Sequence, residues 1–278
     1  MQVMNKTPIA SNYFKTHKIT AIKALGQHFL FNQKICNKIV QASPNKIEGK
    51  TVLEIGPGPG KLTKTILASN PKKLIIIEKD VKFIKQLKEI QALNQSKLEV
   101  IHGDALNFQL SDITATKVII VSNLPYNIGT KLITSWLKQI SYIECMVVML
   151  QDEVVERIVA KYSSKTYGRL SIICQIIADT KKCFKVSPQA FTPPPKVHSS
   201  VISIIPKISK LDKHTLENVQ KIIDLAFQTR RKQLKNCLKE LLKQKNIKEE
   251  EIFNIKLNKR PEQLTPDEYI QLSKLLDY

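Results

Sequence analysis

The sequence predicts an α/β fold in which a Rossmann-like sheet ends in an antiparallel hairpin and is followed by a small all-helical domain. Three observations predict it. Short apolar runs alternate with stretches whose apolar residues recur at helical spacing, which is typical of parallel strands joined by helices. A glycine-rich turn follows the first apolar run. Beyond residue 206, helical spacing continues towards the end of the chain and predicts the separate helical domain.

The glycine-rich turn follows a predicted strand over residues 51–55 and leads into a predicted helix over residues 61–67. Its glycines are spaced G-x-G-x-G, whereas dinucleotide-binding folds have G-x-G-x-x-G. Pro57 and Pro59 have no backbone N–H and cannot help to bind a pyrophosphate. Glu54 adds a carboxylate that repels phosphate and attracts a cation. The turn therefore favours a cationic ligand without phosphates, such as S-adenosylmethionine, over an ordinary αβ turn.

The composition favours a polyanionic partner. In 278 residues, 44 Lys and Arg stand against 24 Asp and Glu, which gives a net charge of +20 and a sequence pI of about 9.7; nucleic acid is the expected partner. Genome base composition is an alternative explanation, because nearly all the basic residues are Lys. The five arginines are therefore more informative: Arg157, Arg169, Arg230, Arg231 and Arg260.

Cysteine usage and hydropathy indicate the compartment. The five cysteines include no C-x-x-C pair and no His at ligand spacing, so we expect reduced thiols, no metal site and a reducing cytosol. No apolar run reaches the length of a membrane span, and none precedes the domain as a secretory signal would. These patterns predict a cytoplasmic protein without a membrane segment.

Polar residues end the next predicted strands. Residues 73–78 form an apolar run that ends in Glu78, and residues 97–104 repeat this design with Asp104. Because a doubly wound sheet binds ligands at the carboxyl ends of its strands, we expect Glu78 to accept ribose hydroxyls and Asp104 to accept the exocyclic amine of an adenine. A fourth strand over residues 117–122 leads into Asn123. The alternative is that these are solvated strand-end residues.

The rest of the chain completes three predicted domains. Two further strands, 182–186 and 197–205, flank a proline-rich segment and form the predicted antiparallel hairpin. Glu48 is the first acidic residue, so the N-terminal arm is purely basic. The predicted domains are a basic arm over residues 1–24, a catalytic domain over 25–206 and a helical RNA-binding domain over 207–278.

The C-terminal domain is expected to contain helices over residues 216–228, 231–245 and 266–276, with a short helical piece near 249–253. In the second helix, basic residues recur every four positions and form a ridge on one face. The cluster at its start indicates phosphate contacts, with a solvated face as the alternative. The predicted RNA-binding residues are Arg230, Arg231, Lys232, Lys235 and Lys239.

The segment after the fourth strand, Asn123-Leu124-Pro125-Tyr126, fits the methylation of an aromatic amine. The lone pair of such an amine is delocalised into the ring, and acceptors that hold its hydrogens out of the ring plane aim that lone pair at the methyl. The side-chain oxygen of Asn123 and the carbonyl of Leu124 supply two acceptors, and Pro125 stiffens the backbone. Tyr126 offers a stacking face for a base that has left its stack. A simple turn is the structural alternative.

Several motifs together resemble the small-subunit ribosomal RNA adenine dimethyltransferases, the kasugamycin-sensitivity methyltransferase family. The motifs are Glu54–Gly58, Gly103–Ala105, Asn123–Asn127, Tyr167–Ser171, Phe191–Val197 and Phe227–Lys232. The similarity spans about residues 21–278. It implies an S-adenosylmethionine-dependent methyltransferase that dimethylates two adjacent adenosines in the 3′-terminal hairpin loop of 16S rRNA. It also implies binding as a monomer to an assembling small subunit.

The resemblance also implies site residues. The implied cofactor contacts are His28, Leu30, Gly56, Glu78, Asp104 and Asn123. The implied catalytic residues around the target amine are Asn123, Leu124, Pro125 and Tyr126, and Phe191 would be a second stacking surface. His28 stands where many relatives have Asn.

Three other functions stay open at this point. The large-subunit rRNA adenine dimethylases share the cofactor turn and a similar motif, but Tyr167–Ser171 and the triple proline favour the small-subunit enzymes. A non-catalytic relative that serves as an RNA-assembly or mitochondrial transcription factor would keep the fold, although the intact Asn123 and Tyr126 disfavour it. A nicotinamide oxidoreductase is disfavoured by the glycine spacing.

Overall fold

The computed structural model describes residues 21–207, 213–247, 252 and 257–276. The basic arm expected over residues 1–24 thus lies outside the described residues, except for its last four. The chain divides into two compact units. The first contains the described residues up to Val155 together with Lys181–Pro206, and the second contains Glu156–Thr180 and the residues from Lys207 onward. The sequence-based domains instead place residues 156–180 in the larger domain.

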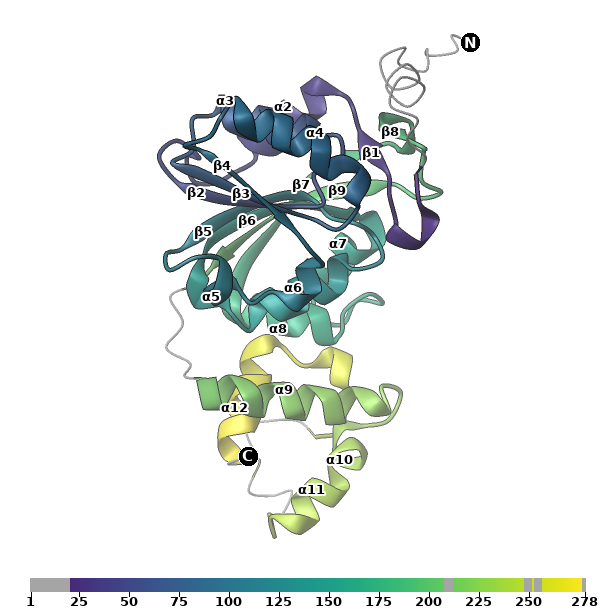
Figure 1. Cartoon of the computed structure of the whole chain (residues 1–278). Coiled ribbons are helices and arrows are strands. Elements are labelled where there is room, and N and C mark those ends of the chain that lie inside the picture. The colour runs from purple at the N-terminus through teal and green to yellow at the C-terminus, as the bar shows by residue number, and fades with distance from the viewer. Residues whose placement is uncertain (1–20, 208–212, 248–251, 253–256, 277–278) are drawn as a thin grey trace, which may run out of the picture. The chain divides into compact units, whose positions relative to one another are not determined.

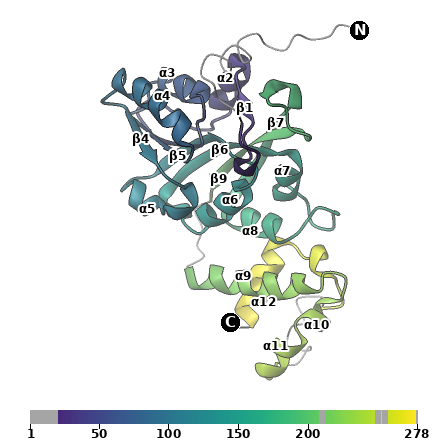
Figure 2. The same ribbon diagram turned by 45° about the vertical axis from the view of Figure 1, so that its right-hand side comes forward.

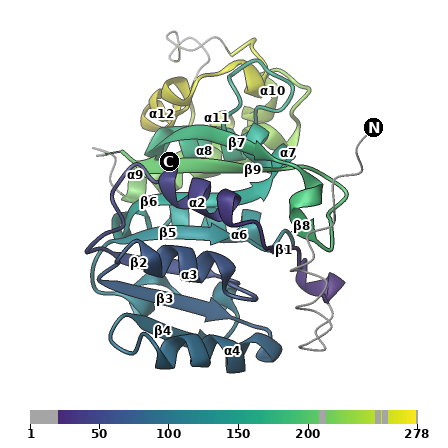
Figure 3. The same cartoon turned by 90° about the horizontal axis from the view of Figure 1, so that it is seen from above.

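The first unit is built on a mixed sheet, which confirms the predicted α/β fold. In the described part of the chain the sheet has seven strands in the order β4-β3-β2-β5-β6-β9-β7 (Figure 3). These are β2 (Thr51–Ile55), β3 (Lys73–Glu78), β4 (Leu98–His102), β5 (Val118–Asn123), β6 (Ile143–Gln151), β7 (Ala178–Val186) and β9 (Ser199–Pro206). The first five are parallel, and β9 pairs antiparallel with β6. The two strands that follow β6 thus form the edge where the hairpin was predicted.

Helices cover both faces of this sheet (Figure 1). On one face lie α2 (Gln33–Gln41), α3 (Lys61–Ala68) and α4 (Val81–Ala92). On the other lie α5 (Leu110–Ile113) and α6 (Gly129–Leu137), and α7 (Asp152–Ile158) follows β6. Strands buried on both faces need continuous apolar runs, and the interior of β3 from Leu74 to Ile77 is fully buried.

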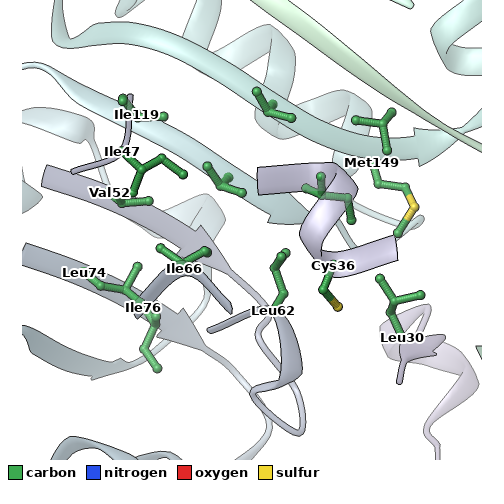
Figure 4. Close-up of a cluster of buried hydrophobic side chains, with 14 of the residues drawn as sticks. Leu30, Cys36, Ile47, Val52, Leu62, Ile66, Leu74, Ile76, Ile119 and Met149 are labelled. Carbon is green, nitrogen blue, oxygen red and sulfur yellow. The ribbon is translucent and has the colours of Figure 1, made fainter. Parts of the chain in front are cut away.

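A cluster of buried side chains holds α2 and α3 against the sheet (Figure 4). Cys36 and Ile39 come from α2, Ile66 comes from α3, and Val52 and Leu74 come from the strands beneath. Each such aliphatic side chain contributes roughly 1.5–3 kcal/mol when it is fully removed from water. This packing fixes the glycine-rich turn between β2 and α3.

A short strand pair joins two distant segments of the first unit. β1 (Phe29–Leu30) pairs antiparallel with β8 (Phe191–Thr192), with Leu30 opposite Phe191. The pair brings the segment before α2 beside the segment before β9. The region around His28 and the proline-rich stretch therefore meet, although more than 160 residues separate them in sequence.

The second unit is helical (Figure 2). It contains α8 (Arg169–Ile177), α9 (Lys213–Gln228), α10 (Leu234–Cys237), α11 (Lys239–Gln244), the 3-10 turn η6 (Pro261–Gln263) and α12 (Pro266–Leu275). α9 packs against α8 and α12. Two buried tyrosines fasten the η6 segment, since the Tyr167 hydroxyl donates to the Leu264 carbonyl (3.0 Å) and the Tyr269 hydroxyl to the Pro261 carbonyl (2.9 Å).

The prediction of one continuous helix over residues 231–245 is wrong. α10 begins only at Leu234, and the helix is interrupted at Leu238 before α11 begins. The N–H groups of Leu234 and Lys235 donate to carbonyls of residues 259 and 257. Tertiary pairing therefore decides where the helix begins, and the basic residues do not form a ridge on one helix. The short piece expected near 249–253 lies outside the described residues, apart from Ile252. None of the helices in the described ranges is long and apolar enough to cross a membrane.

Candidate active site

The carboxyl ends of β2, β3, β4 and β5 surround a cleft with about 950 Å³ of empty space, part of it open to solvent. Nine of the predicted site residues line it together: His28, Leu30, Gly56, Glu78, Asp104, Asn123, Leu124, Pro125 and Tyr126. The structure therefore brings the residues predicted for the cofactor and those predicted for the amine into one cleft, and most of them lie at the shared edge of the parallel strands.

The glycine-rich turn uses its N–H groups internally. Gly56 donates to the Ile77 carbonyl (2.9 Å) and Gly58 donates to Oε2 of Glu78 (3.0 Å). Gly56 and Gly58 have φ angles of +61° and +53°, where a side chain is strained. A Cβ on Gly58 would also lie 2.8 Å from the ring of Phe29. With two prolines beside them, these glycines leave the turn poorly suited to a pyrophosphate and fitted to a ligand that approaches the bare backbone.

The carboxylate of Glu78 is buried and held in one orientation. Its Oε1 accepts the Asp80 N–H (2.8 Å), and its Oε2 accepts the Gly58 N–H (3.0 Å). Burial raises the pKa of Glu78, and the two N–H donors partly oppose this shift. Each oxygen keeps a lone pair for a ligand hydroxyl. The arrangement thus presents two rigid acceptors at the end of β3, as binding of a ribose needs.

Asp104 follows β4 and faces the same cleft. Its Oδ2 accepts from Nζ of Lys79 (2.7 Å), and its Oδ1 accepts the Leu106 N–H (3.0 Å). The hydrogen bond from Lys79 is the main reason that the pKa of Asp104 lies below its usual value. The carboxylate is ionised at neutral pH and can accept from an exocyclic amine.

Glu54 differs from the sequence-based interpretation. The side chain is buried beneath the turn, and the Thr63 hydroxyl donates to its Oε2 (2.7 Å). Burial raises the pKa of Glu54 to about 8. The carboxyl of Glu54 therefore holds its proton more tightly than a solvated carboxylate does. A cation bound nearby would favour the ionised form of Glu54, so binding of a cationic ligand would itself strengthen the attraction between the carboxylate and the ligand.

Asn123 and Leu124 present two acceptors into the cleft. Nδ2 of Asn123 donates to the carbonyl of His28 (3.2 Å), which orients the amide. Oδ1 of Asn123 accepts no hydrogen bond from the described residues, and neither does the Leu124 carbonyl oxygen. The Leu124 N–H donates to the Met149 carbonyl (3.1 Å) and fixes the peptide at the end of β5.

Tyr126 lies beside His28, with ring centroids 5.2 Å apart and a tilt of 36° between the planes. Nδ1 of His28 donates to the Pro193 carbonyl (2.8 Å), because a carbonyl oxygen carries no proton. Burial raises the pKa of Tyr126, so its hydroxyl stays protonated at neutral pH. The two rings form one wall of the cleft.

Phe191 is not in the cleft. Its side chain is 3% exposed and packs in the core beside β1. Stacking of a base on this ring would need the β1–β8 pair to move. The local sequence motif cannot reveal that Phe191 is buried, because its burial depends on a partner strand more than 160 residues away.

The predicted RNA-binding residues lie in the second unit and fall into two groups. Arg230 is engaged, since its Nη2 donates to the Lys165 carbonyl (3.0 Å) and its Nε lies 3.6 Å from Oε2 of Glu262. The other four, Arg231, Lys232, Lys235 and Lys239, form no ion pair within the described residues, and all but Lys235 are exposed. Arg230 thus supports the unit's structure, and the others are available to phosphates.

Three functional neighbours were missed in the sequence. Asp80 orients Glu78 through its N–H and accepts from Nε2 of Gln27 (2.8 Å). Lys79 holds Asp104. Ser199 contacts Tyr126. Asp80 could have been found as the N-cap of α4, but the Ser199 contact has no local signal.

No group of three or more His, Cys, Asp or Glu side chains that could hold a metal ion occurs within the described ranges. The five cysteines, all of them in described segments, are free thiols.

Known proteins resemble this chain along most of its length. The family model "Ribosomal RNA adenine dimethylase" matches residues 19–278. The "Ribosomal RNA small subunit methyltransferase A" of Rhodospirillum rubrum is 41% identical over 226 residues, covering 81% of this chain and 78% of the relative. The protein of the same name from Wolbachia pipientis wMel is 38% identical over 274 residues, covering 98% of this chain and 94% of the relative.

Solved structures show the same fold. A dimethyladenosine transferase from Plasmodium falciparum has a TM-score of 0.74 at 26% identity, covering 88% of this chain and 96% of the other. The 23S rRNA methyltransferase ErmE has a TM-score of 0.68 at 22% identity, covering 90% of this chain and all of the other, and is evidence of shared fold alone. With its cleft and the match along almost its whole length, this chain belongs to the ribosomal RNA adenine dimethylase family, whose members transfer methyl groups from S-adenosylmethionine.

Proposed function

We propose that this enzyme dimethylates the N6 amines of two adjacent adenosines in the 3′-terminal hairpin loop of 16S rRNA. We also propose that it acts as a monomer on a precursor small subunit in the cytoplasm. The small-subunit assignment is supported by curated relatives about 40% identical. One observation carries the chemistry: the cleft holds two unoccupied acceptors, Asn123 Oδ1 and the Leu124 carbonyl, beside a turn suited to a ligand without phosphates.

S-adenosylmethionine supplies an electrophilic methyl on its sulfonium, and the residues present fit it. Glu78 offers its two fixed oxygens to the ribose hydroxyls, and Asp104 accepts from the adenine amine. Gly56 lets the chain approach the ligand closely. His28 and Leu30 close the cleft from the N-terminal side.

The target adenine enters the cleft as an extruded base. Tyr126 stacks on it, a contact worth roughly 1–3 kcal/mol. Asn123 Oδ1 and the Leu124 carbonyl accept the two N6 hydrogens, and Pro125 stiffens the chain between these acceptors and Tyr126. This would aim the amine lone pair at the methyl that bound S-adenosylmethionine supplies. Transfer would be an in-line displacement in which the S–CH3 bond breaks as the N–CH3 bond forms and S-adenosylhomocysteine leaves, with a rate that comes from positioning. The methylated ammonium is acidic and releases its proton to solvent, so no strong general base is needed.

The second unit supplies charge rather than chemistry in this proposal. Arg231, Lys232, Lys235 and Lys239 would contact RNA phosphates and hold the hairpin, with Arg230 at the start of the cluster. In this proposal residues 1–24 are a basic arm, residues 25–206 a catalytic domain and residues 207–278 a helical RNA-binding domain, although residues 156–180 belong to the second compact unit.

The test is to incubate the protein with labelled S-adenosylmethionine and undermethylated small subunits and then to map the modified nucleotides. We expect N6-dimethylation of two adjacent adenosines in the 3′-terminal hairpin. Methylation of large-subunit RNA instead would assign the enzyme to the other branch of the family. Cofactor binding without transfer to either subunit would indicate a non-catalytic assembly factor.

A further inference from the structure

The segment that links β8 to β9 makes three contacts with the rest of the first unit, and two of them reach residues that line the cleft. The Pro193 carbonyl accepts from Nδ1 of His28 (2.8 Å), and the His198 carbonyl accepts the Asp152 N–H (2.9 Å). At its end the hydroxyl of Ser199 hydrogen-bonds the hydroxyl of Tyr126. The third contact reaches a residue of the proposed amine site.

Ser199 is a fixed point. It is fully buried and is the first residue of β9, where it pairs with Gln151 of β6. A buried residue in a paired strand has little freedom to move. The Ser199 hydroxyl therefore offers the Tyr126 hydroxyl a hydrogen-bond partner at a fixed position. Tyr126, in contrast, lies in the loop between β5 and α6 and is only half-buried.

The Tyr126 ring needs such a partner. A stacking platform works only if its plane is fixed, and a tyrosine side chain in a loop can rotate about two torsions. His28 contacts one part of the ring at 5.2 Å between centroids, which limits the ring from the side. The contact with Ser199 limits it at the hydroxyl end.

We propose that Ser199 is a positioning residue for methyl transfer, which fixes the plane of the Tyr126 ring so that a stacked adenine places its amine at Asn123 and Leu124. The inference rests on the proposed stacking role of Tyr126. Ser199 does not line the cleft, so its loss affects the transfer step and leaves the cofactor site intact.

The experiment compares Ser199→Ala, Tyr126→Phe and the double variant on undermethylated small subunits. Tyr126→Phe keeps the stacking ring and removes the same hydrogen bond from the other side. We expect each single variant to lower kcat about tenfold, in line with the sensitivity of positioned reactions to small displacements. The double variant should be no worse than either single variant, because both remove one contact. The Kd for S-adenosylmethionine, measured by calorimetry, should stay within twofold of wild type.

Two controls separate positioning from folding. Ser203→Ala removes a hydroxyl from the same strand at a position outside the cleft lining, and should leave kcat unchanged. Ser199→Thr keeps the hydroxyl and should restore most of kcat. Thermal unfolding of each variant, followed by circular dichroism, identifies any loss of folded protein, and Tyr126→Phe still tests the contact if Ser199→Ala does not fold.

The outcomes are distinguishable. If the wild-type enzyme does not modify the small-subunit RNA, the proposed function fails. If wild type is active but Ser199→Ala retains its kcat, or if the effects of Ser199→Ala and Tyr126→Phe multiply in the double variant, the positioning role is overturned and the proposed function stands.

Discussion

The cleft of the first unit and the basic segment 230–239 of the second differ in how their polar groups are held. In the cleft, Glu78 is buried and each of its oxygens accepts a backbone N–H. In the basic segment, Arg231 and Lys239 are exposed and have no ion pair within the described residues. We expect the cleft to act through fixed geometry and the basic segment to act through charge. Conservative substitutions should therefore be costly in the first region and tolerated in the second.

The largest effect is expected at the centre of the cleft. Asn123→Ala removes one of the two proposed acceptors for the target amine and should reduce methyl transfer to background. Because Glu78 and the glycine-rich turn are unchanged, binding of S-adenosylmethionine should be largely retained. Filter assays measure the expected loss of methyl transfer, and calorimetry measures the expected retention of S-adenosylmethionine binding. Transfer near the wild-type rate would mean that Asn123 has been assigned the wrong role.

Gly58→Ala tests how rigid the cleft is. The new Cβ would lie 2.8 Å from the Phe29 ring at a φ of +53°, so the turn must move and shift the N–H that Glu78 accepts. We expect S-adenosylmethionine to bind at least tenfold more weakly. Gly49→Ala is a matched control, since Gly49 also has a positive φ (+71°) but has no atom within 4 Å of the new Cβ. Equal effects of the two substitutions would show that strain alone, about 1–2 kcal/mol, is responsible.

Charge reversal tests the other region. Arg231→Glu with Lys235→Glu should weaken RNA binding by about tenfold or more and should flatten its dependence on salt, by roughly 0.7–0.9 in slope for each lost phosphate contact. Titrations of hairpin RNA at several salt concentrations measure both. Arg231→Lys keeps the charge and should change little. An unchanged salt slope in the double variant would mean that this segment makes no phosphate contacts and is an ordinary solvated surface.

Arg230 and Arg231 are neighbours that should behave differently. Arg230→Ala breaks the contacts with the Lys165 carbonyl and Glu262, and we expect it to lower the free energy of unfolding by about 1 kcal/mol, because the ion pair is partly exposed. Arg231→Ala should leave stability unchanged and affect RNA binding only. Chemical denaturation compares the two, and equal stabilities would contradict the structural role of Arg230.

The remaining prediction concerns the pH dependence of stability. The pKa of Glu54 is about 8 in the folded protein against about 4.5 ordinarily. Between these values the native state keeps a proton that the unfolded state has released, so the Glu54 contribution to stability is lost as pH rises from about 4.5 to about 8. Glu54→Gln should remove this part of the slope, whereas Glu48→Gln, at an exposed position, should not. Denaturant midpoints at several pH values measure the slopes.

The sequence by itself determined the fold class and most of the cleft. Apolar runs and the glycine-rich turn fix the order of strands and helices, and in a parallel sheet the strand ends share one edge. Glu78, Asp104 and Asn123 therefore had to meet there. These are consequences of local periodicity and topology, which a single chain displays directly.

Tertiary structure decided the features that depend on distant partners. The β1–β8 pair buries Phe191, the carbonyls of Leu257 and Lys259 set where α10 begins, and burial raises the pKa of Glu54. The contact of Ser199 with Tyr126 belongs to the same class. Each depends on residues brought together across long stretches of chain, and the free energies of burial and pairing that decide them leave no mark on local sequence.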